Sequence, residues 1–272
     1  MKYEDVLESA EYLRSLIKKS PRVALVLGTG LGAIADRMVT EIAVPYKELP
    51  NFAVTTVSDH QGRLVFGSLA GQPVVAMQGR LHYYEGYPLE LVTFPIRVMR
   101  NLGAEILIIN SAAGGLDPSC VPGEVMLIED HINLLGNNPL RGLTDDRFGD
   151  RFPDMSRPYC PELIKLAESA ALKNGIKLHR GVYVSVAGPS LETRAETRML
   201  KLLGANCVGM STVPEVITGV QTGFRIMALA AITNVNIPDE MEIISLGQVI
   251  SNAKIAEDKM SAIITEVIAR LD

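Results

Sequence analysis

Several residue types are scarce in this chain, and each scarcity excludes a class of protein. The 272 residues include no tryptophan, three cysteines and four histidines, and charges or prolines interrupt every apolar run before it reaches membrane-spanning length. The cysteines are too few and too far apart for a disulfide framework or a paired zinc motif. The histidines show no HExxH or comparable spacing, so we predict no metal.

Positive charge is also in short supply. Lysine and arginine total 26 against 31 acidic residues, which gives a formal net charge of -5. A negative chain does not attract nucleic acid or an anionic membrane through its overall field, so neither is an expected partner. Residues 1–20 are charged throughout and lack the apolar core of a signal peptide. With unpaired thiols, this predicts a cytoplasmic protein that binds anions through a local cluster of donors.

What the sequence does contain is an alternation of strand and helix patterns. Short apolar runs predict buried strands at residues 23–27, 63–69, 73–78, 105–110, 124–129, 180–187 and 225–232. Helical patterns occur at 88–102, 161–174, 192–203, 213–222 and 251–271. No repeat, linker or low-complexity tract divides the chain, so we predict one α/β domain spanning residues 1–272. Ligands in such folds bind at the carboxyl ends of the strands.

The segment QGRLHYYEGY (78–87) follows one of these strands and carries four reactive side chains. Arg80 and His82 are two residues apart, so on extended backbone both project to one side. A guanidinium fork beside an imidazole suits an anion such as phosphate. Tyr84 and Glu85 follow directly. The alternative for this loop taken alone is an exposed arginine and a surface histidine.

A glycine-rich turn, GTGLG at residues 28–32, follows the first predicted strand. Its glycines let backbone amides approach an anion, and Thr29 adds a hydroxyl donor. Extended to GTGLGA, the segment also fits the dinucleotide fingerprint, which requires an acidic residue about twenty positions later. Glu48 has that distance but lies in a proline-flanked turn. An NAD-dependent dehydrogenase is therefore a weakly supported alternative.

The remaining strand ends also carry polar groups, each with a structural alternative. NSAAGGL (110–116) permits close backbone contact with a ligand or tight strand-to-helix packing. Glu192 of VAGPSLET precedes a helix, so it could bind a ligand or simply complement the helix dipole. Ser211 of VGMSTVPEV, with Thr212, could bind a ligand or cap the following helix. In ITNVNIP, the side-chain amide of Asn234 suits the edge of a heterocyclic base, or the residue forms a turn. Together these strand ends predict one shared pocket.

This set of motifs resembles the trimeric purine nucleoside phosphorylases of the inosine and guanosine type. The likeness rests on GTGLG, DHQGRLVFG, QGRLHYYEGYPLELVTFPIRV, NSAAGGL, DHINL with NPLRG, RFGDRFP, AGPSLET and GMSTVPEV. It implies a central mixed, partly barrel-like β-sheet flanked by helices, and a homotrimer with active sites near the subunit interfaces. It also implies phosphorolysis of 6-oxopurine ribo- and deoxyribonucleosides to the free base and (deoxy)ribose 1-phosphate in purine salvage. Inorganic phosphate would be a co-substrate, and no cofactor is expected.

The resemblance also implies roles for individual residues. Asn234, Glu192 and His82 would be catalytic, and Phe152 would reach into the site of a neighbouring subunit. The implied phosphate ligands are Thr29, His60, Arg80, His82, Ser211 and the backbone amide of Ala112. The implied nucleoside-binding residues are Tyr84, Tyr183, Leu191, Glu192, Met210, Thr233, Asn234 and Leu246.

Three of these positions depart from the family pattern. Thr29 replaces the usual serine and keeps the hydroxyl, and Leu191 replaces a phenylalanine, so ring stacking on the base is lost. Leu246 aligns with a histidine that approaches the ribose 5′-hydroxyl. One hydrogen bond is worth about 0.5–1.5 kcal/mol net, so activity should survive the change. We expect a more apolar 5′ end of the pocket and tolerance of 5′-deoxynucleosides.

Two other functions would use a similar pocket. A nucleoside hydrolase would attack with water and usually needs a carboxylate base or a metal, whereas the arginine, histidine and glycine turn favour phosphate. A non-catalytic nucleoside- or phosphate-binding protein would release no free base. Dependence of base release on added phosphate separates these functions.

Overall fold

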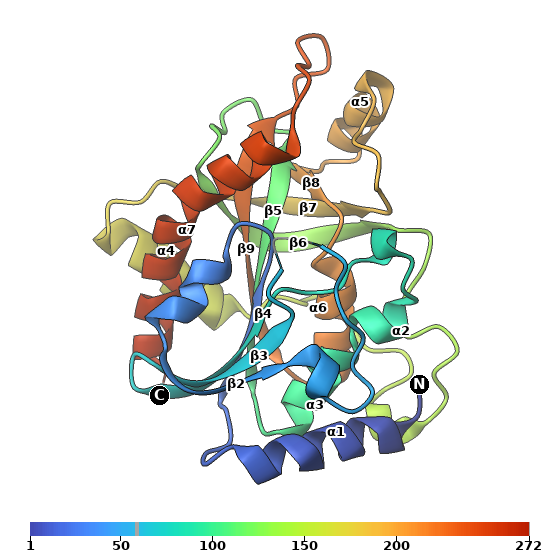
Figure 1. Cartoon of the computed structure of the whole chain (residues 1–272). Coiled ribbons are helices and arrows are strands. Elements are labelled where there is room, and N and C mark those ends of the chain that lie inside the picture. The colour runs from blue at the N-terminus through green and yellow to red at the C-terminus, as the bar shows by residue number, and fades with distance from the viewer. Residues whose placement is uncertain (58–59, 272) are drawn as a thin grey trace.

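The strands of the protein form one mixed sheet (Figure 1). The computed structural model describes residues 1–57 and 60–271; Asp59, with which the DHQGRLVFG motif begins, lies outside them. Nine strands belong to the sheet within the described residues. They are β1 (Val23–Leu27), β2 (Val39–Pro45), β3 (Arg63–Leu69), β4 (Gln72–Gln78), β5 (Ile106–Gly115), β6 (Val125–Leu134), β7 (Leu178–Val186), β8 (Cys207–Gly209) and β9 (Arg225–Val235).

One part of the sheet closes on itself. The strand order is β2-β3-β4-β1-β5-β8-β7-β6-β9, and β9 also pairs with β5. Strands β5, β8, β7, β6 and β9 therefore form a ring, from which β1 to β4 extend as an open sheet. Strand β1 is parallel to β4 and β5, whereas β2 with β3 and β6 with β9 are antiparallel. The predicted mixed, partly barrel-like sheet of a single α/β domain is confirmed.

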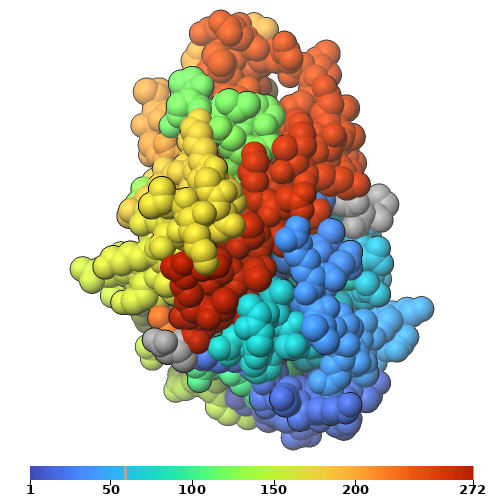
Figure 2. Space-filling model, turned by 90° about the vertical axis from the view of Figure 1, so that its left-hand side faces the viewer, coloured from blue at the N-terminus to red at the C-terminus, as the bar shows by residue number. Residues whose placement is uncertain are grey.

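Helices flank this sheet. They are α1 (Tyr3–Leu16), α2 (Leu89–Val92), α3 (Phe94–Asn101), α4 (Pro161–Lys173), α5 (Arg194–Leu202), α6 (Val213–Gln221) and α7 (Leu246–Ala269). Figure 1 places α4 and α7 on one side of the sheet and α3 and α6 on the other. Figure 2 shows α4 and α7 side by side on the surface that they form. No helix in the described part of the chain is both long and apolar enough to cross a membrane.

The apolar pattern of α7 explains why this long helix lies against the sheet. Its buried residues recur at helical spacing and contact β9, so one face of the helix joins the core. They include Ala253, Ala256, Met260, Ile263, Ile264 and Val267. The helix begins at Leu246 rather than at the predicted residue 251, because Ser245 caps it by accepting a hydrogen bond from the amide of Gln248. The first turns of α7 therefore reach the edge of the site described below.

The predicted strands are confirmed, with two omissions and several shifted boundaries. Strand β2 was missed because it is mostly exposed at the sheet edge, and β8 because it spans only three residues. Strand β5 continues into the NSAAGGL motif as far as Gly115, beyond the predicted end of the strand at residue 110. The predicted helix 88–102 breaks at Thr93. Pro95 lacks the amide that would donate to the carbonyl of Leu91 in a continuous helix, which explains that break.

Candidate active site

The predicted strand-end motifs surround one cavity of about 400 Å³. Its walls come from the loops after β1, β4 and β8, the ends of β5 and β9, and the segments before α5 and α7. The predicted site residues that line it are Thr29, Arg80, His82, Tyr84, Ala112, Leu191, Glu192, Met210, Ser211, Thr233, Asn234 and Leu246. Segments far apart in the sequence thus meet in one pocket. Roles in turns, helix caps or local packing would not require these segments to lie together.

Arg80 lies at one end of this cavity, which we call the anion end. Its guanidinium is 1% exposed, and Nη1 donates to Glu215 Oε1 at 2.9 Å while Nη2 donates to the carbonyl of Asn110. Arg80 Nε and the hydroxyl of Ser111 are buried without a hydrogen-bond partner in the described part of the chain. Buried polar atoms are nearly always satisfied, so these two mark a place where a polar or anionic ligand would bind.

The turn after β1 approaches the anion end closely because residue 28 is glycine. A Cβ at Gly28 would lie 2.9 Å from the carbonyl oxygen of Asn110 and 3.1 Å from Arg80 Nη2. The next residue, Thr29, places its hydroxyl 3.3 Å from His60 Nε2. A larger residue at position 28 would push the turn and this hydroxyl away from the cavity.

His60 supports the anion end without lining the cavity. Its Nδ1 lies 2.8 Å from the carbonyl oxygen of Arg80, and its ring centroid lies 5.2 Å from that of His82. Burial, and then the neighbouring His82, lower the pKa of His60 to about 4. The ring is therefore neutral at physiological pH, and its contacts position Arg80 and Thr29 rather than supply charge.

His82 is oriented by a carboxylate behind it. Glu85 accepts hydrogen bonds from the backbone amide of His82 at 2.7 Å and from the amide of Thr56 at 2.6 Å, and its Oε1 lies 3.1 Å from His82 Nδ1. Burial acts to raise the pKa of Glu85, but the hydrogen bonds from His82 and Thr56 lower it to about 2. Because an ionised carboxylate only accepts, His82 carries its proton on Nδ1 and leaves Nε2 for a ligand. Tyr84 stacks on the imidazole with ring centroids 4.7 Å apart.

Ser211 and Thr212 do not cap α6. The amide of Val213 donates to the carbonyl of Ser211 at 2.7 Å, and Thr212 has φ 68° and ψ -55°, which defines a strained γ-turn. Neither hydroxyl makes a side-chain cap bond. The backbone amide of Ser211 donates to the hydroxyl of Tyr183, so the turn is supported from below. Strained backbone of this kind is concentrated at ligand sites, and here it leaves the Ser211 hydroxyl facing the cavity.

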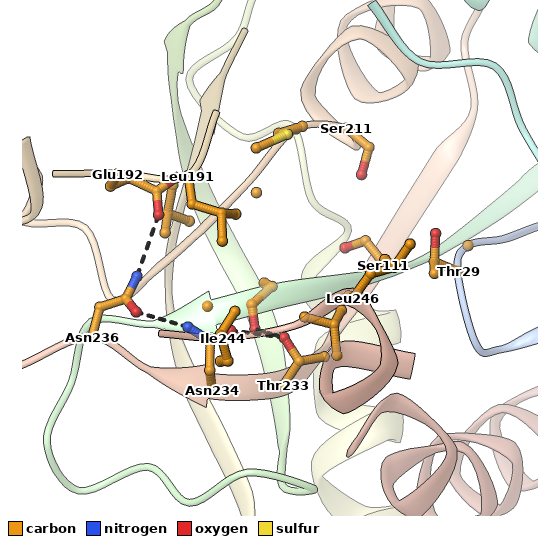
Figure 3. Close-up of a pocket in the computed structure, with 18 of the residues that line it drawn as sticks. Thr29, Ser111, Leu191, Glu192, Ser211, Thr233, Asn234, Asn236, Ile244 and Leu246 are labelled. Atoms are coloured by element: carbon orange, nitrogen blue, oxygen red, sulfur yellow. Dashed lines mark hydrogen bonds between the residues drawn. The ribbon is translucent and has the colours of Figure 1, made fainter. Parts of the chain in front are cut away.

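The opposite end of the cavity holds a chain of side-chain hydrogen bonds, which we call the amide relay (Figure 3). The hydroxyl of Thr233 donates to Asn234 Oδ1 at 3.0 Å, and Asn234 Nδ2 donates to Asn236 Oδ1 at 2.7 Å. Asn236 Nδ2 then donates to Glu192 Oε2 at 3.3 Å. Burial raises the pKa of Glu192. This end therefore offers an acceptor carboxylate and a donor–acceptor amide side by side.

Apolar side chains separate the two ends. Leu246 and Ile244 line the cavity; Figure 3 shows Leu246 between Thr233 and the hydroxyls of Ser111 and Thr29, and Ile244 beside the amide relay. Further apolar lining comes from Val208, Met210, Leu191, Met241, Ile243 and Val249. Ile243 is 98% exposed and Leu246 is 66% exposed, so the rim formed by residues 241–249 is apolar yet open to solvent. The cavity therefore offers donors for an anion at one end, an apolar surface in its middle, and a carboxylate and amides for hydrogen bonding at the other end.

Besides His60, two further predicted site residues lie outside the lining of the cavity. Tyr183 is fully buried beneath the γ-turn and does not line the cavity, because Gly209 and Ser211 lie between its hydroxyl and the open space. Phe152 also does not line the cavity; it is 86% exposed, and its contact with a neighbouring subunit stays a prediction.

Ser111, Glu215, Asn236 and, apart from Leu246, the apolar rim 241–249 were not predicted from the sequence. Glu215 sits in the first turn of α6, where an acid is ordinarily read as a dipole partner. Asn236 had only its place in the ITNVNIP motif as a signal. The rim residues could have been found as the apolar letters that follow β9 in a segment with no periodicity.

The dinucleotide-binding interpretation of GTGLGA is wrong. That fingerprint requires a full helix after the turn and a parallel neighbouring strand that ends in an acid. Here the turn leads into the short 3₁₀ helix η1 (Gly32–Arg37) and then into β2, which is antiparallel to β3 at the sheet edge. Glu48 lies in the 3₁₀ helix η2 (Tyr46–Glu48) beyond that edge. Among the described residues, no group of three or more His, Cys, Asp or Glu side chains is placed to hold a metal ion.

Comparison with known proteins identifies the class to which this fold and site belong. Residues 22–269 match the family model described as the phosphorylase superfamily, so the chain belongs to that superfamily. It is 46% identical over 270 residues to the purine nucleoside phosphorylase of Rattus norvegicus, covering 97% of this chain and 93% of the relative. It is 48% identical over 227 residues to purine nucleoside phosphorylase 1 of Geobacillus stearothermophilus, covering 84% and 83%. Within the superfamily, the chain is therefore a member of the purine nucleoside phosphorylase family.

A solved structure agrees with this assignment. The purine nucleoside phosphorylase of Schistosoma mansoni in complex with inosine superimposes with a TM-score of 0.94 at 38% identity, covering 100% of this chain and 98% of that chain. Similarity at this level extends over the complete sheet and its helices.

Proposed function

We propose that this protein cleaves 6-oxopurine ribo- and deoxyribonucleosides by phosphorolysis, releasing the base and (deoxy)ribose 1-phosphate. The observation that carries the proposal is the separation of two binding chemistries within one cavity. Arg80, His82 and the hydroxyls of Thr29, Ser111 and Ser211 gather at the anion end, and Glu192 and Asn234 lie at the other. A nucleoside between them would place its anomeric carbon between a bound phosphate and the base-binding groups.

At the anion end, the protein would supply position rather than a nucleophile. Bound phosphate itself attacks the anomeric carbon, so no activated serine or cysteine is needed. The Arg80 guanidinium is fixed by Glu215 and Asn110, and His82 is fixed by Glu85, so both would meet phosphate without reorganising. A phosphate dianion beside Nε2 favours the protonated imidazole, which then donates to it. The anion also stabilises the cationic sugar that forms as the base departs.

At the other end, the amide relay would bind the purine. A 6-oxopurine carries a proton on N1, which the Glu192 carboxylate can accept as a hydrogen bond. As the glycosidic bond breaks, electron density moves onto the imidazole ring of the base, and an N–H of Asn234 directed at N7 stabilises it. A donor aimed at developing charge contributes about 2.7–4 kcal/mol to lowering the barrier. Leu191, Met210 and the apolar rim would enclose the sugar and the faces of the base.

Assembly, location and pathway are further parts of this proposal. We expect a homotrimer in the cytoplasm that acts in purine salvage and uses no cofactor. An aromatic ring as exposed as that of Phe152 is available to reach a neighbouring subunit. Light scattering should give the trimer mass, and Phe152→Ala should raise the KM for inosine. Leu172→Ala, at a residue 84% exposed on α4, is the matched control. A monomer with full activity would contradict this part.

The deciding experiment measures inosine cleavage with and without phosphate at equal ionic strength. We expect release of hypoxanthine only with phosphate, together with ribose 1-phosphate detected by phosphorus NMR. Equal release in both buffers would indicate a hydrolase, and no release would indicate a binding protein. Arg80→Lys should raise the KM for phosphate, since lysine lacks the planar fork. Arg180→Lys, on the surface beside Glu129 and Glu168, is the control for the same chemical change.

A further inference from the structure

The amide relay contains one residue to which no role in the reaction has been given. Asn236 is 8% exposed and lies between the two groups proposed to read the base. Its Oδ1 accepts from Asn234 and its Nδ2 donates to Glu192. We infer that Asn236 is a positioning residue that couples Glu192 to Asn234 and thereby selects 6-oxopurines over 6-aminopurines. This inference rests on the proposed function.

The direction of the relay follows from the charge of Glu192. An ionised carboxylate only accepts hydrogen bonds, so Asn236 must turn Nδ2 toward it. Asn236 Oδ1 then faces Asn234, and Asn234 must answer with Nδ2. A protonated Glu192 would donate instead and would favour the opposite orientation of both amides. The charge state at the N1 side of the base therefore determines which atoms of Asn234 face N7.

The surrounding backbone holds Asn236 in place independently of its side chain. Its amide donates to the carbonyl of Gly115 at 2.8 Å, which continues the pairing of β9 with β5. Gly114 lies beneath the relay, and a Cβ there would lie 3.2 Å from both Asn234 Nδ2 and Asn236 Nδ2. The sheet thus leaves space for both amides, and replacing the side chain of Asn236 removes the relay without removing a strand contact.

Asn236 also opposes the groups that favour protonation of Glu192. Burial is the largest of these, and Glu196 on α5 adds to it. Glu242, another acidic residue, lines the same cavity. A backbone hydrogen bond at Glu192, and then the hydrogen bond from Asn236, act in the other direction and favour the ionised carboxylate. Replacing Asn236 by leucine should raise the pKa of Glu192, and replacing it by aspartate should raise it further through like-charge repulsion.

The selectivity follows from what each purine presents at N1. Inosine carries an N1 proton and requires an acceptor, whereas adenosine has a lone pair on N1 and requires a donor. An ionised Glu192 is an acceptor only, and a protonated Glu192 supplies a donor. Asn236→Asp should therefore raise kcat/KM for adenosine and lower kcat/KM for inosine.

The test compares wild type, Asn236→Leu, Asn236→Asp and the surface control Asn138→Asp. Carbon NMR of the ligand-free protein measures the Glu192 pKa, assigned with Glu192→Gln, and kcat/KM is measured for inosine and adenosine from pH 5 to 9. For Asn236→Leu we expect the pKa of the Glu192 carboxyl to rise by about one unit. The acid limb of the pH profile of kcat/KM for inosine should move to higher pH by the same amount. For Asn236→Asp we expect the inosine-to-adenosine ratio of kcat/KM to fall about tenfold.

The two readouts separate this inference from the proposed function. An unchanged Glu192 pKa in folded Asn236→Leu would overturn the relay whatever the activity. An unchanged inosine-to-adenosine ratio in folded Asn236→Asp would overturn the selectivity role. A wild type without phosphorolysis but with the expected NMR shift would overturn the proposed function and leave the relay standing.

Discussion

The buried pair of Arg80 and Glu215 gives the sharpest prediction. Their side chains are 1% and 2% exposed, with Nη1 and Oε1 2.9 Å apart. Glu215→Gln keeps the size and one acceptor oxygen but removes the charge that neutralises Arg80. Removing one partner of a buried pair costs about 3–5 kcal/mol, because the remaining charge is left uncompensated in a dry site. The glutamine oxygen still accepts from Arg80, so we expect a loss of about 3 kcal/mol.

The same change should strengthen phosphate binding. With a neutral residue at position 215, bound phosphate becomes the negative group nearest to Arg80. The repulsion between phosphate and the buried Glu215 carboxylate is also removed. Phosphate binds the folded state, so its stabilising effect grows with the ratio of its concentration to Kd. The variant should therefore be less stable than wild type in phosphate-free buffer and recover part of that loss as phosphate is added.

The assay is thermal and urea unfolding across a phosphate series, with phosphate binding measured by calorimetry. Without phosphate, we expect the Tm of Glu215→Gln to fall by about 6–12 °C. Glu129→Gln is the matched control, because Glu129 pairs with Arg180 at the surface and an exposed pair contributes about 0–1 kcal/mol. If Glu215→Gln has wild-type stability and wild-type phosphate affinity, the charge of Glu215 does not compensate that of Arg80.

Three other predictions concern the leaving base, the ribose and acid stability. Asn234→Ala should lower kcat for inosine by about a hundredfold with little change in the KM for phosphate, since its donor acts on developing charge; the reverse pattern in steady-state kinetics would reassign the residue. Leu246→His should raise kcat/KM for inosine relative to that for 5′-deoxyinosine, because the wild type presents an apolar group to the 5′ position. A wild type whose kcat/KM favours inosine by orders of magnitude would contradict this. The pKa of Glu85 lies at about 2 in the fold, below its ordinary value of 4.5, so its contribution to stability is present above pH 4.5 and is lost as the pH falls toward 2. Glu85→Gln should therefore flatten the acid limb of stability measured by circular dichroism, and an unaltered limb would contradict the assigned hydrogen bonds.

The sequence predicted those parts of the fold and the site that local patterns determine. Runs such as VALVL identify strands because all five residues of β1 are buried. The polar residues that end β1, β4 and β9 could be placed together because parallel strands deliver their carboxyl ends to one edge. Strand β2 gave no such signal, since its largely exposed edge position leaves no periodic burial.

What the sequence could not predict is contact across the fold. The family resemblance implies that Tyr183 lines the pocket, yet the γ-turn at Thr212 brings Gly209 and Ser211 over it. The ring closure of β5 with β9, which sets how near the two ends of the cavity lie, depends on pairing between strands more than a hundred residues apart in sequence. No local pattern encodes that distance.

A common arrangement explains why the supporting residues of the site are hard to predict from the sequence. Each group proposed to touch substrate has a second residue behind it: Glu215 behind Arg80, Glu85 behind His82, and Asn236 between Glu192 and Asn234. The residue in front must match the ligand, so its chemistry is readable in a strand-end motif. The residue behind must only match its neighbour in space, and for Arg80 that neighbour is 135 positions away. Buried charges and amides are stable only when such partners are present. A buried functional side chain that is predicted from the sequence without a partner therefore implies a partner elsewhere in the fold.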